Sequence, residues 1–194
     1  MLKPDYILLS ILAIIIVLGI VILASVSAPL GQSKFNDSYY FLKHQLIFGF
    51  LPGIILALFF FNIKLAFLKK IAPLLFVIGL FLMLTVFLPL IGLQQGGASR
   101  WLNIGPFSFQ PSEFLKLSFI LYLASWLVSR SQAQGKNQTL FLFLVIIGAI
   151  FILLYLQSNI STLGIIVLTG FLMYFSAKTP FWHSILIIIL GFIG

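Results

Sequence analysis

The fold class of this chain is decided by residues 6–26, which read YILLSILAIIIVLGIVILASV. The run has no charged residue, and its length matches the ~20 residues that an α-helix needs to cross the hydrocarbon core of a bilayer. A signal-peptide core would be shorter and would be followed closely by a small-residue cleavage site. We therefore interpret this run as a retained membrane span.

The composition extends this interpretation to the whole chain. Of 194 residues, 62% are hydrophobic and only 7% are charged, whereas soluble domains carry about 25% charged residues. Long apolar runs without alternation do not suit a transmembrane barrel, and open sheets leave unpaired backbone groups in lipid. We predict an all-α fold, a polytopic transmembrane helical bundle with about six complete spans and a partial seventh.

Polar stretches separate the apolar runs and divide the chain into spans. The predicted complete spans are residues 6–26, 44–61, 71–93, 113–128, 140–156 and 161–175. The last run, Phe181 to Gly194, supplies only 14 residues and stops without a polar flank. We therefore expect residues 1–194 to form one transmembrane domain that is a fragment of a longer protein.

The charge pattern predicts the orientation of the chain in the membrane. The net charge is +8, with 11 cations against three acids, and no cysteine is present to form disulfides or bind a metal. The cations flank apolar runs and form no basic helix face, so nucleic-acid binding is not expected. With the amino terminus in the cytoplasm, the inner connections would hold Lys3, Lys64, Lys69, Lys70, Arg130, Lys136 and Lys178. This excess favours a cytoplasmic amino terminus and places residues 94–112 at the outer face.

Glu113 and Lys116 are an acid and a base placed within an apolar segment, on one face of a helix. A lone lysine in a span costs ~2.5–3.5 kcal/mol on insertion scales, so the nearby carboxylate reduces a real penalty. Two interpretations remain open: an ion pair that fixes helix packing, or a pair that lines a substrate cavity. Ser112 has the position and chemistry of a helix N-cap.

Two further polar stretches are candidates for binding. Arg100 and Trp101 follow two glycines at a predicted membrane edge, where the guanidinium would either bind an anion or order the loop. Residues 157–162, QSNIST, form a polar island that predicts an internal polar network or a helix break lining a cavity, built as a tight hairpin at the outer face. His44 and His183 are interpreted as polar tips at the membrane interface, without metal ligation.

Several of these stretches resemble the SEDS family, the FtsW, RodA and SpoVE proteins of bacterial division, elongation and sporulation. The resemblance rests on GASRWL at residues 97–102, on FQPSEFLKL at residues 109–117 and on the polar island, which is similar to that family's Gln-Pro-Asp-x-Gly-Thr motif. It covers essentially the whole chain. The run YLASW at residues 122–126 leans towards the FtsW branch.

The resemblance implies a protein of about ten spans in the bacterial plasma membrane, active at the division septum or in shape maintenance. It implies a peptidoglycan glycosyltransferase that polymerises lipid II and works with a class B penicillin-binding protein. It also implies that the catalytic Asp lies in an outer loop beyond Gly194, so no catalytic residue is assigned within this chain. The resemblance names no cofactor here, although a divalent cation is compatible with the full-length protein.

This sequence departs from the family's motif at two positions, because Asn159 stands in place of its Asp and Ser161 in place of its Gly. An amide cannot supply a negative charge, so Lys116 would depend more heavily on Glu113. A lipid II transporter and a non-catalytic scaffold of the division complex are the alternative functions. The expected substrate-binding or cavity residues are Arg100, Gln110, Ser112, Glu113, Lys116, Gln157, Asn159 and Thr162, with no metal ligand among them.

Overall fold

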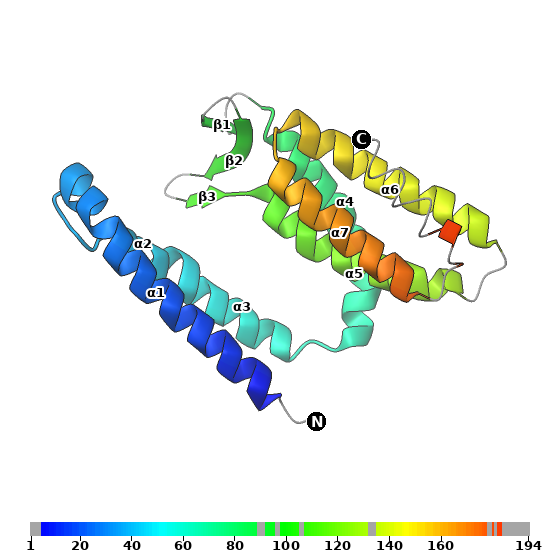
Figure 1. Cartoon of the computed structure of the whole chain (residues 1–194), viewed down its shortest axis with the longest axis horizontal. Helices are drawn as coiled ribbons and strands as arrows, with labels where there is room; N and C mark the ends of the chain where they lie inside the picture. The colour runs from blue at the N-terminus through cyan, green and yellow to red at the C-terminus, as the bar shows by residue number, and fades with distance from the viewer. Residues whose placement is uncertain are drawn as a thin grey trace. The chain divides into compact units, whose positions relative to one another are not determined.

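The computed structural model describes residues 5–88, 92–95, 98–104, 107–131, 135–177, 180 and 182–183. The chain forms two compact units, Met1–Ile63 and Lys64–Gly194. Helices dominate both units, as the apolar runs predict, and the all-α membrane class is confirmed (Figure 1).

The first unit begins with helix α1 (Tyr6–Phe35). Asp5 caps its start, because the side-chain Oδ1 accepts hydrogen bonds from the backbone N–H groups of Ile7 and Leu8 at 3.0 and 3.1 Å. The predicted end at Val26 is wrong, and the helix continues for a further nine residues. Its serines do not break it because their hydroxyls donate to carbonyls one turn earlier, as Ser27 does to Leu23 at 2.6 Å.

A tight connection joins α1 to the second span. Lys43 Nζ lies 2.8 Å from Asp37 Oδ2. Gly31 allows the connection to fold against the helix, since a Cβ there would lie 2.7 Å from the Asp37 carbonyl oxygen. The second span runs from Tyr40 to Phe61 rather than from His44.

The second span contains a change of helix type. It consists of α2 (Tyr40–Gln45), a π-helical turn η1 (Leu46–Phe50) and α3 (Leu51–Phe61). Pro52 has no N–H with which to continue the α-helical ladder, and the π-helical turn ends two residues before it. Most apolar side chains of α1 and α3 are exposed, as expected of helices surrounded by lipid.

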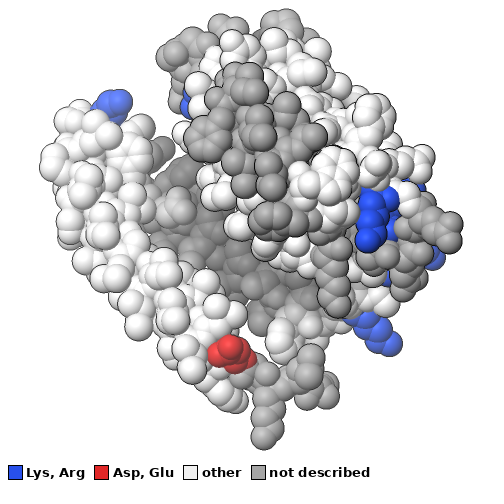
Figure 2. All heavy atoms as spheres, turned by 45° about the vertical axis from the view of Figure 1, so that its right-hand side comes forward, with Lys and Arg blue, Asp and Glu red and all other residues white. Residues whose placement is uncertain are grey.

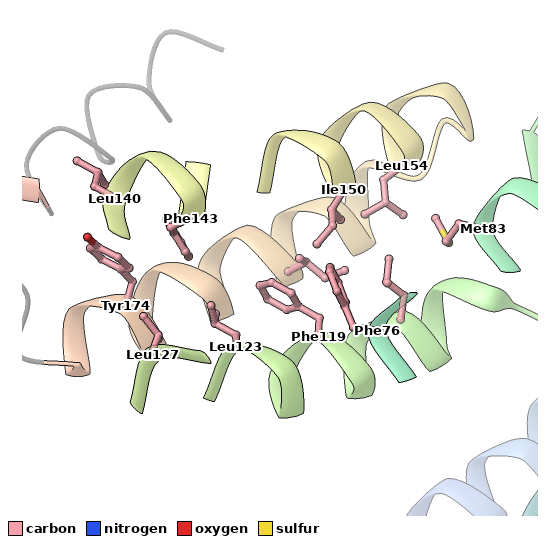
Figure 3. Close-up of a cluster of buried hydrophobic side chains, with 12 residues drawn as sticks. Phe76, Met83, Phe119, Leu123, Leu127, Leu140, Phe143, Ile150, Leu154 and Tyr174 are labelled. Atoms are coloured by element: carbon pink, nitrogen blue, oxygen red, sulfur yellow. The ribbon is translucent and has the colours of Figure 1, made fainter. Parts of the chain in front are cut away.

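In its described part, the second unit is a bundle of four helices with a small sheet. Its elements are α4 (Leu65–Thr85), β1 (Gly92–Gln95), β2 (Ala98–Ile104), β3 (Phe107–Phe109), α5 (Pro111–Ser131), α6 (Lys136–Leu156) and α7 (Ile160–Ser176). Helix α4 packs along α5, and α7 contacts both α5 and α6. Figure 3 shows the side chains that fill the space between these helices. The buried core comprises Phe76, Met83, Leu115, Phe119, Leu123, Leu127, Leu140, Phe143, Ile150, Leu154, Ile166 and Tyr174.

Two glycines lie where these helices approach each other closely. At Gly79 in α4, a Cβ would lie 2.9 Å from the Ser118 hydroxyl and 3.1 Å from a Leu115 methyl group. At Gly170 in α7, a Cβ would lie 3.1 Å from the ring of Phe119. Small residues at helix crossings are typical of membrane bundles, in which backbones approach closely to gain van der Waals contact.

The sheet was not predicted. Residues 94–112 were expected to be a polar loop, but β1, β2 and β3 form an antiparallel sheet in which Leu102 pairs with Gly92 and with Phe109. Leu102 is 3% exposed and ties the sheet to the unit's interior. The strands are short, and the longest has seven residues, so their sequence carries too little apolar alternation to indicate a sheet.

Within the described residues, five helical segments are long and apolar enough to cross a membrane, namely residues 6–35, 40–61, 65–85, 111–130 and 136–156. Helix α7 is apolar but has 17 residues.

The predicted third span ends early, because the chain leaves α4 at Thr85 in two tight turns, ahead of Pro89. Apart from Trp182 and His183, the predicted partial seventh span lies outside the described residues. In Figure 2, uncharged residues make up most of the described surface on this face, with a few patches of Lys and Arg and one of Asp or Glu.

Candidate functional site

The turn between α6 and α7 is the centre of the polar region. Ser158 adopts a left-handed φ of 54°. Its N–H donates to the Tyr155 carbonyl at 2.9 Å, and the N–H of Asn159 donates to the Leu154 carbonyl at 2.9 Å. This pair of bonds is the Schellman motif, with serine at the position where glycine is usual. The predicted tight hairpin at residues 157–162 is therefore present.

Gln157 connects this turn to the end of α4. Its side chain is 1% exposed, and Nε2 donates to the Met83 carbonyl at 2.8 Å. Met83 lies in the last turn of α4, where carbonyls lack partners within the helix. The buried amide therefore satisfies a main-chain group that lipid could not.

Asn159 connects the same turn to the start of α5. Its Nδ2 donates to Ser112 Oγ at 3.2 Å, and both side chains are buried. The predicted N-cap role of Ser112 is wrong, because α5 begins at Pro111 and the N–H of Glu113 donates to the Gln110 carbonyl at 3.0 Å. Gln110 is half-buried just before the helix, and Thr162 is buried in the first turn of α7.

Arg100 connects the sheet to the turn. Its Nε donates to the Gln157 carbonyl at 3.4 Å, and its Nη2 donates to the Ser158 carbonyl. We call the group formed by Arg100, Ser112, Gln157, Ser158 and Asn159 the turn cluster. It joins β2, α4, α5, α6 and α7, which explains why a polar island occurs within an apolar sequence.

Charged side chains lie next to the turn cluster on α5. Lys116 Nζ is 2.9 Å from Glu113 Oε1, so the ion pair that their spacing predicts is present. The Lys116 side chain is 24% exposed and that of Glu113 is 56% exposed. The carboxylate thus remains open to a ligand while it holds the ammonium. That the pair lines a substrate cavity stays a prediction.

A second polar group lies at the other ends of α6 and α7, and sequence reasoning missed it. Tyr174 Oη is 2.8 Å from His183 Nδ1, and His183 Nε2 is 3.4 Å from Asn137 Oδ1. We call these three residues the histidine cluster. His183 is fully buried, so its interpretation as an interfacial polar tip is wrong, whereas His44 is exposed. The only signal was a single imidazole within an apolar run.

The described residues offer no group of three or more His, Cys, Asp or Glu side chains that could hold a metal ion. Near the turn cluster the available carboxylate is Glu113, which is already paired with Lys116. A divalent cation prefers several oxygen ligands, so this donor set does not fit one.

Comparison with known proteins identifies the family. The family model for FtsW, RodA and SpoVE, described as "Cell cycle protein", matches residues 5–194. The chain therefore belongs to this family, and it is a multi-pass membrane protein.

Two curated relatives illustrate the likeness. The chain is 35% identical to "Probable peptidoglycan glycosyltransferase FtsW" of Nitrosococcus halophilus, over 97% of this chain and 49% of that protein. It is 33% identical to "Stage V sporulation protein E" of Bacillus subtilis, over 99% of this chain and 52% of that protein. The chain spans about half the length of these relatives.

Solved structures agree with this assignment. The rod shape determining protein RodA of Thermus thermophilus is 26% identical, with a TM-score of 0.77 over 99% of this chain and 60% of that chain. A chain from a peptidoglycan synthase complex, described for its coordination of polymerization and crosslinking, is 26% identical. Its TM-score is 0.80 over 98% of this chain and 52% of that chain.

Proposed function

We propose that this chain is part of a peptidoglycan glycosyltransferase that polymerises lipid II at the outer face of the bacterial plasma membrane. The observation that carries the proposal is the Glu113–Lys116 ion pair beside the turn cluster. Charged groups are costly in a membrane helix and are usually retained for function. The name of the FtsW relative in Nitrosococcus halophilus supports the same activity.

The chemistry of glycan polymerisation suits this pair. In such a transfer, an acceptor hydroxyl loses its proton to a base and its oxygen bonds to the anomeric carbon of the donor sugar, while the bond from that carbon to the pyrophosphate oxygen breaks. Lys116 supplies a cation for the charge that develops on the departing pyrophosphate, and Glu113 holds its ammonium in place. The base is expected from an Asp beyond Gly194, as the family resemblance implies.

The partner of the full-length protein is proposed to be a class B penicillin-binding protein, which cross-links the strands. The peptidoglycan synthase complex among the similar structures supports this assignment. We also propose a cytoplasmic amino terminus and a role at the division septum. The first rests on the cations of the predicted inner connections, and the second on the resemblance to the FtsW branch.

The test uses the full-length protein, purified with its penicillin-binding partner and supplied with purified lipid II. Wild type should form glycan chains, and Lys116→Gln should reduce the rate about 100-fold or more because transition-state charge stabilisation is lost. Lys70→Gln, which changes an exposed lysine of α4, is the matched control and should retain the wild-type rate.

Two results would contradict the proposal. If wild type forms no glycan but moves lipid II across the membrane of empty vesicles, the protein is a transporter. If it does neither and still assembles with its partner, it is a scaffold.

A further inference from the structure

Arg100 reaches across the fold to the main chain of a distant turn. The guanidinium donates to the carbonyls of Gln157 and Ser158, which are 57 and 58 residues further along the chain. Arg100 lies where the pairing of β2 with β1 shifts register, because Trp101 pairs with Leu93 whereas Ser99 pairs with Gln94. Such a bulge takes a side chain out of the regular alternation, and here the guanidinium is directed to the turn after α6.

The two carbonyls are suited to a cation. They follow directly after Leu156, the last residue of α6. The carboxyl end of a helix carries a partial negative charge and unpaired carbonyls, which a positive side chain stabilises. Because a guanidinium holds its donors in a rigid fork, it binds two neighbouring acceptors better than an ammonium does.

The same turn fixes two helices through its own side chains. Gln157 holds α4 at Met83, and Asn159 holds α5 at Ser112. The sheet leads directly into α5 through β3 and Gln110. A shift of β2 relative to the turn would therefore move the start of α5, where Glu113 and Lys116 lie.

We propose that Arg100 is a positioning residue that fastens the sheet to the carboxyl end of α6 and thereby places the Glu113–Lys116 pair. Two of its three guanidinium nitrogens donate to main-chain carbonyls, and for this reason we assign it to positioning rather than to a contact with the substrate's pyrophosphate. This inference rests on the proposed function for its effect on catalysis. The claim that Arg100 fastens the sheet to the end of α6 does not depend on the proposed function.

The kinetic test compares Arg100→Lys and Arg100→Gln in the full-length protein with its partner. Both variants should lower kcat for lipid II polymerisation about 10-fold or more, because misplacement of reacting groups slows catalysis steeply. The KM for lipid II should change by less than about 2-fold, since no substrate contact is removed. Arg130→Gln, which changes the chain's other arginine, is the matched control and should leave both constants unchanged.

A second measurement does not depend on activity. Hydrogen exchange at the amides of Ser158 and Asn159 reports on the turn, because both amides are bonded within it. Exchange should be faster in both Arg100 variants and unchanged in Arg130→Gln. If the Arg100 variants fold poorly, Ser158→Gly provides a background in which the left-handed φ costs less, and the same comparison is made there.

The proposal would be overturned by a raised KM at unchanged kcat, with Arg100→Lys recovering most of the wild-type affinity, because that pattern indicates anion binding. Unchanged exchange at the turn would overturn it as well. If wild-type protein forms no glycan, the proposed function fails, whereas the exchange comparison still decides whether Arg100 fastens the turn.

Discussion

Helices α6 and α7 bury polar side chains at both ends, but the two ends differ in charge. The turn cluster contains a guanidinium and lies beside the Glu113–Lys116 pair, which is partly exposed. The histidine cluster joins a phenol, an imidazole and an amide, with the rings of Phe143 and Trp182 packed against it. Neutral groups that satisfy one another fasten the fold, whereas partly exposed charges in a membrane protein indicate chemistry. We therefore assign a functional role to the end of α6 and α7 that holds the turn cluster, and a structural role to the end that holds the histidine cluster.

The largest expected effect is that of Glu113→Ala. The variant leaves the ammonium of Lys116 without its carboxylate, and an isolated lysine in a span costs ~2.5–3.5 kcal/mol. The yield of monodisperse full-length protein after detergent extraction should fall several-fold. The double variant Glu113→Ala with Lys116→Leu should recover the yield, since it removes the uncompensated charge. Equal yields for Glu113→Ala and wild type would show that Lys116 does not depend on Glu113.

The next largest effect is expected for Gln157→Leu. It removes the buried donor that binds the Met83 carbonyl, and loss of such a partner costs about 1–3 kcal/mol. Thermal unfolding in detergent should show the loss, together with slower polymerisation per folded molecule. Gln138→Leu is the control, because that side chain is exposed on α6. If the melting temperature falls equally in both variants, the bond from Gln157 to Met83 makes no particular contribution to stability.

Tyr174→Phe tests the opposite end. It deletes the hydroxyl that bonds to His183 Nδ1, and the expected loss of stability is about 0.5–1.5 kcal/mol. Polymerisation per folded molecule should not change, because the histidine cluster is assigned no part in the chemistry. A loss of activity at unchanged stability would show that the histidine cluster takes part in the chemistry, which contradicts its structural role.

Asn159→Asp is expected to have the smallest effect. The Ser112 hydroxyl can rotate and donate to a carboxylate in place of accepting from the amide. Yield and melting temperature should both stay within error of wild type near neutral pH. A clear loss of yield would show that the neutral amide at this position is required.

The sequence predicted the features that depend on local pattern and on the membrane. Uncharged runs of sufficient length have to become helices in lipid, so the class and most of the spans were correct. The Glu113–Lys116 contact followed from helical spacing alone. The helix ends were less accurate, because α1 accommodates its serines through hydroxyl bonds to its own backbone and continues past them, and because α4 ends ahead of Pro89.

The remaining features depended on contacts between residues far apart in the chain. No local pattern indicates that Gln157 binds the carbonyl of Met83, that Arg100 binds the end of α6, or that His183 is buried against Tyr174. Such bonds form because a polar group without water must find a partner wherever the packing of helices brings one. The sequence alone thus established a multi-pass membrane bundle with a paired acid and base. The tertiary structure decided which polar groups meet, since packing sets which donors and acceptors lie within reach of each other.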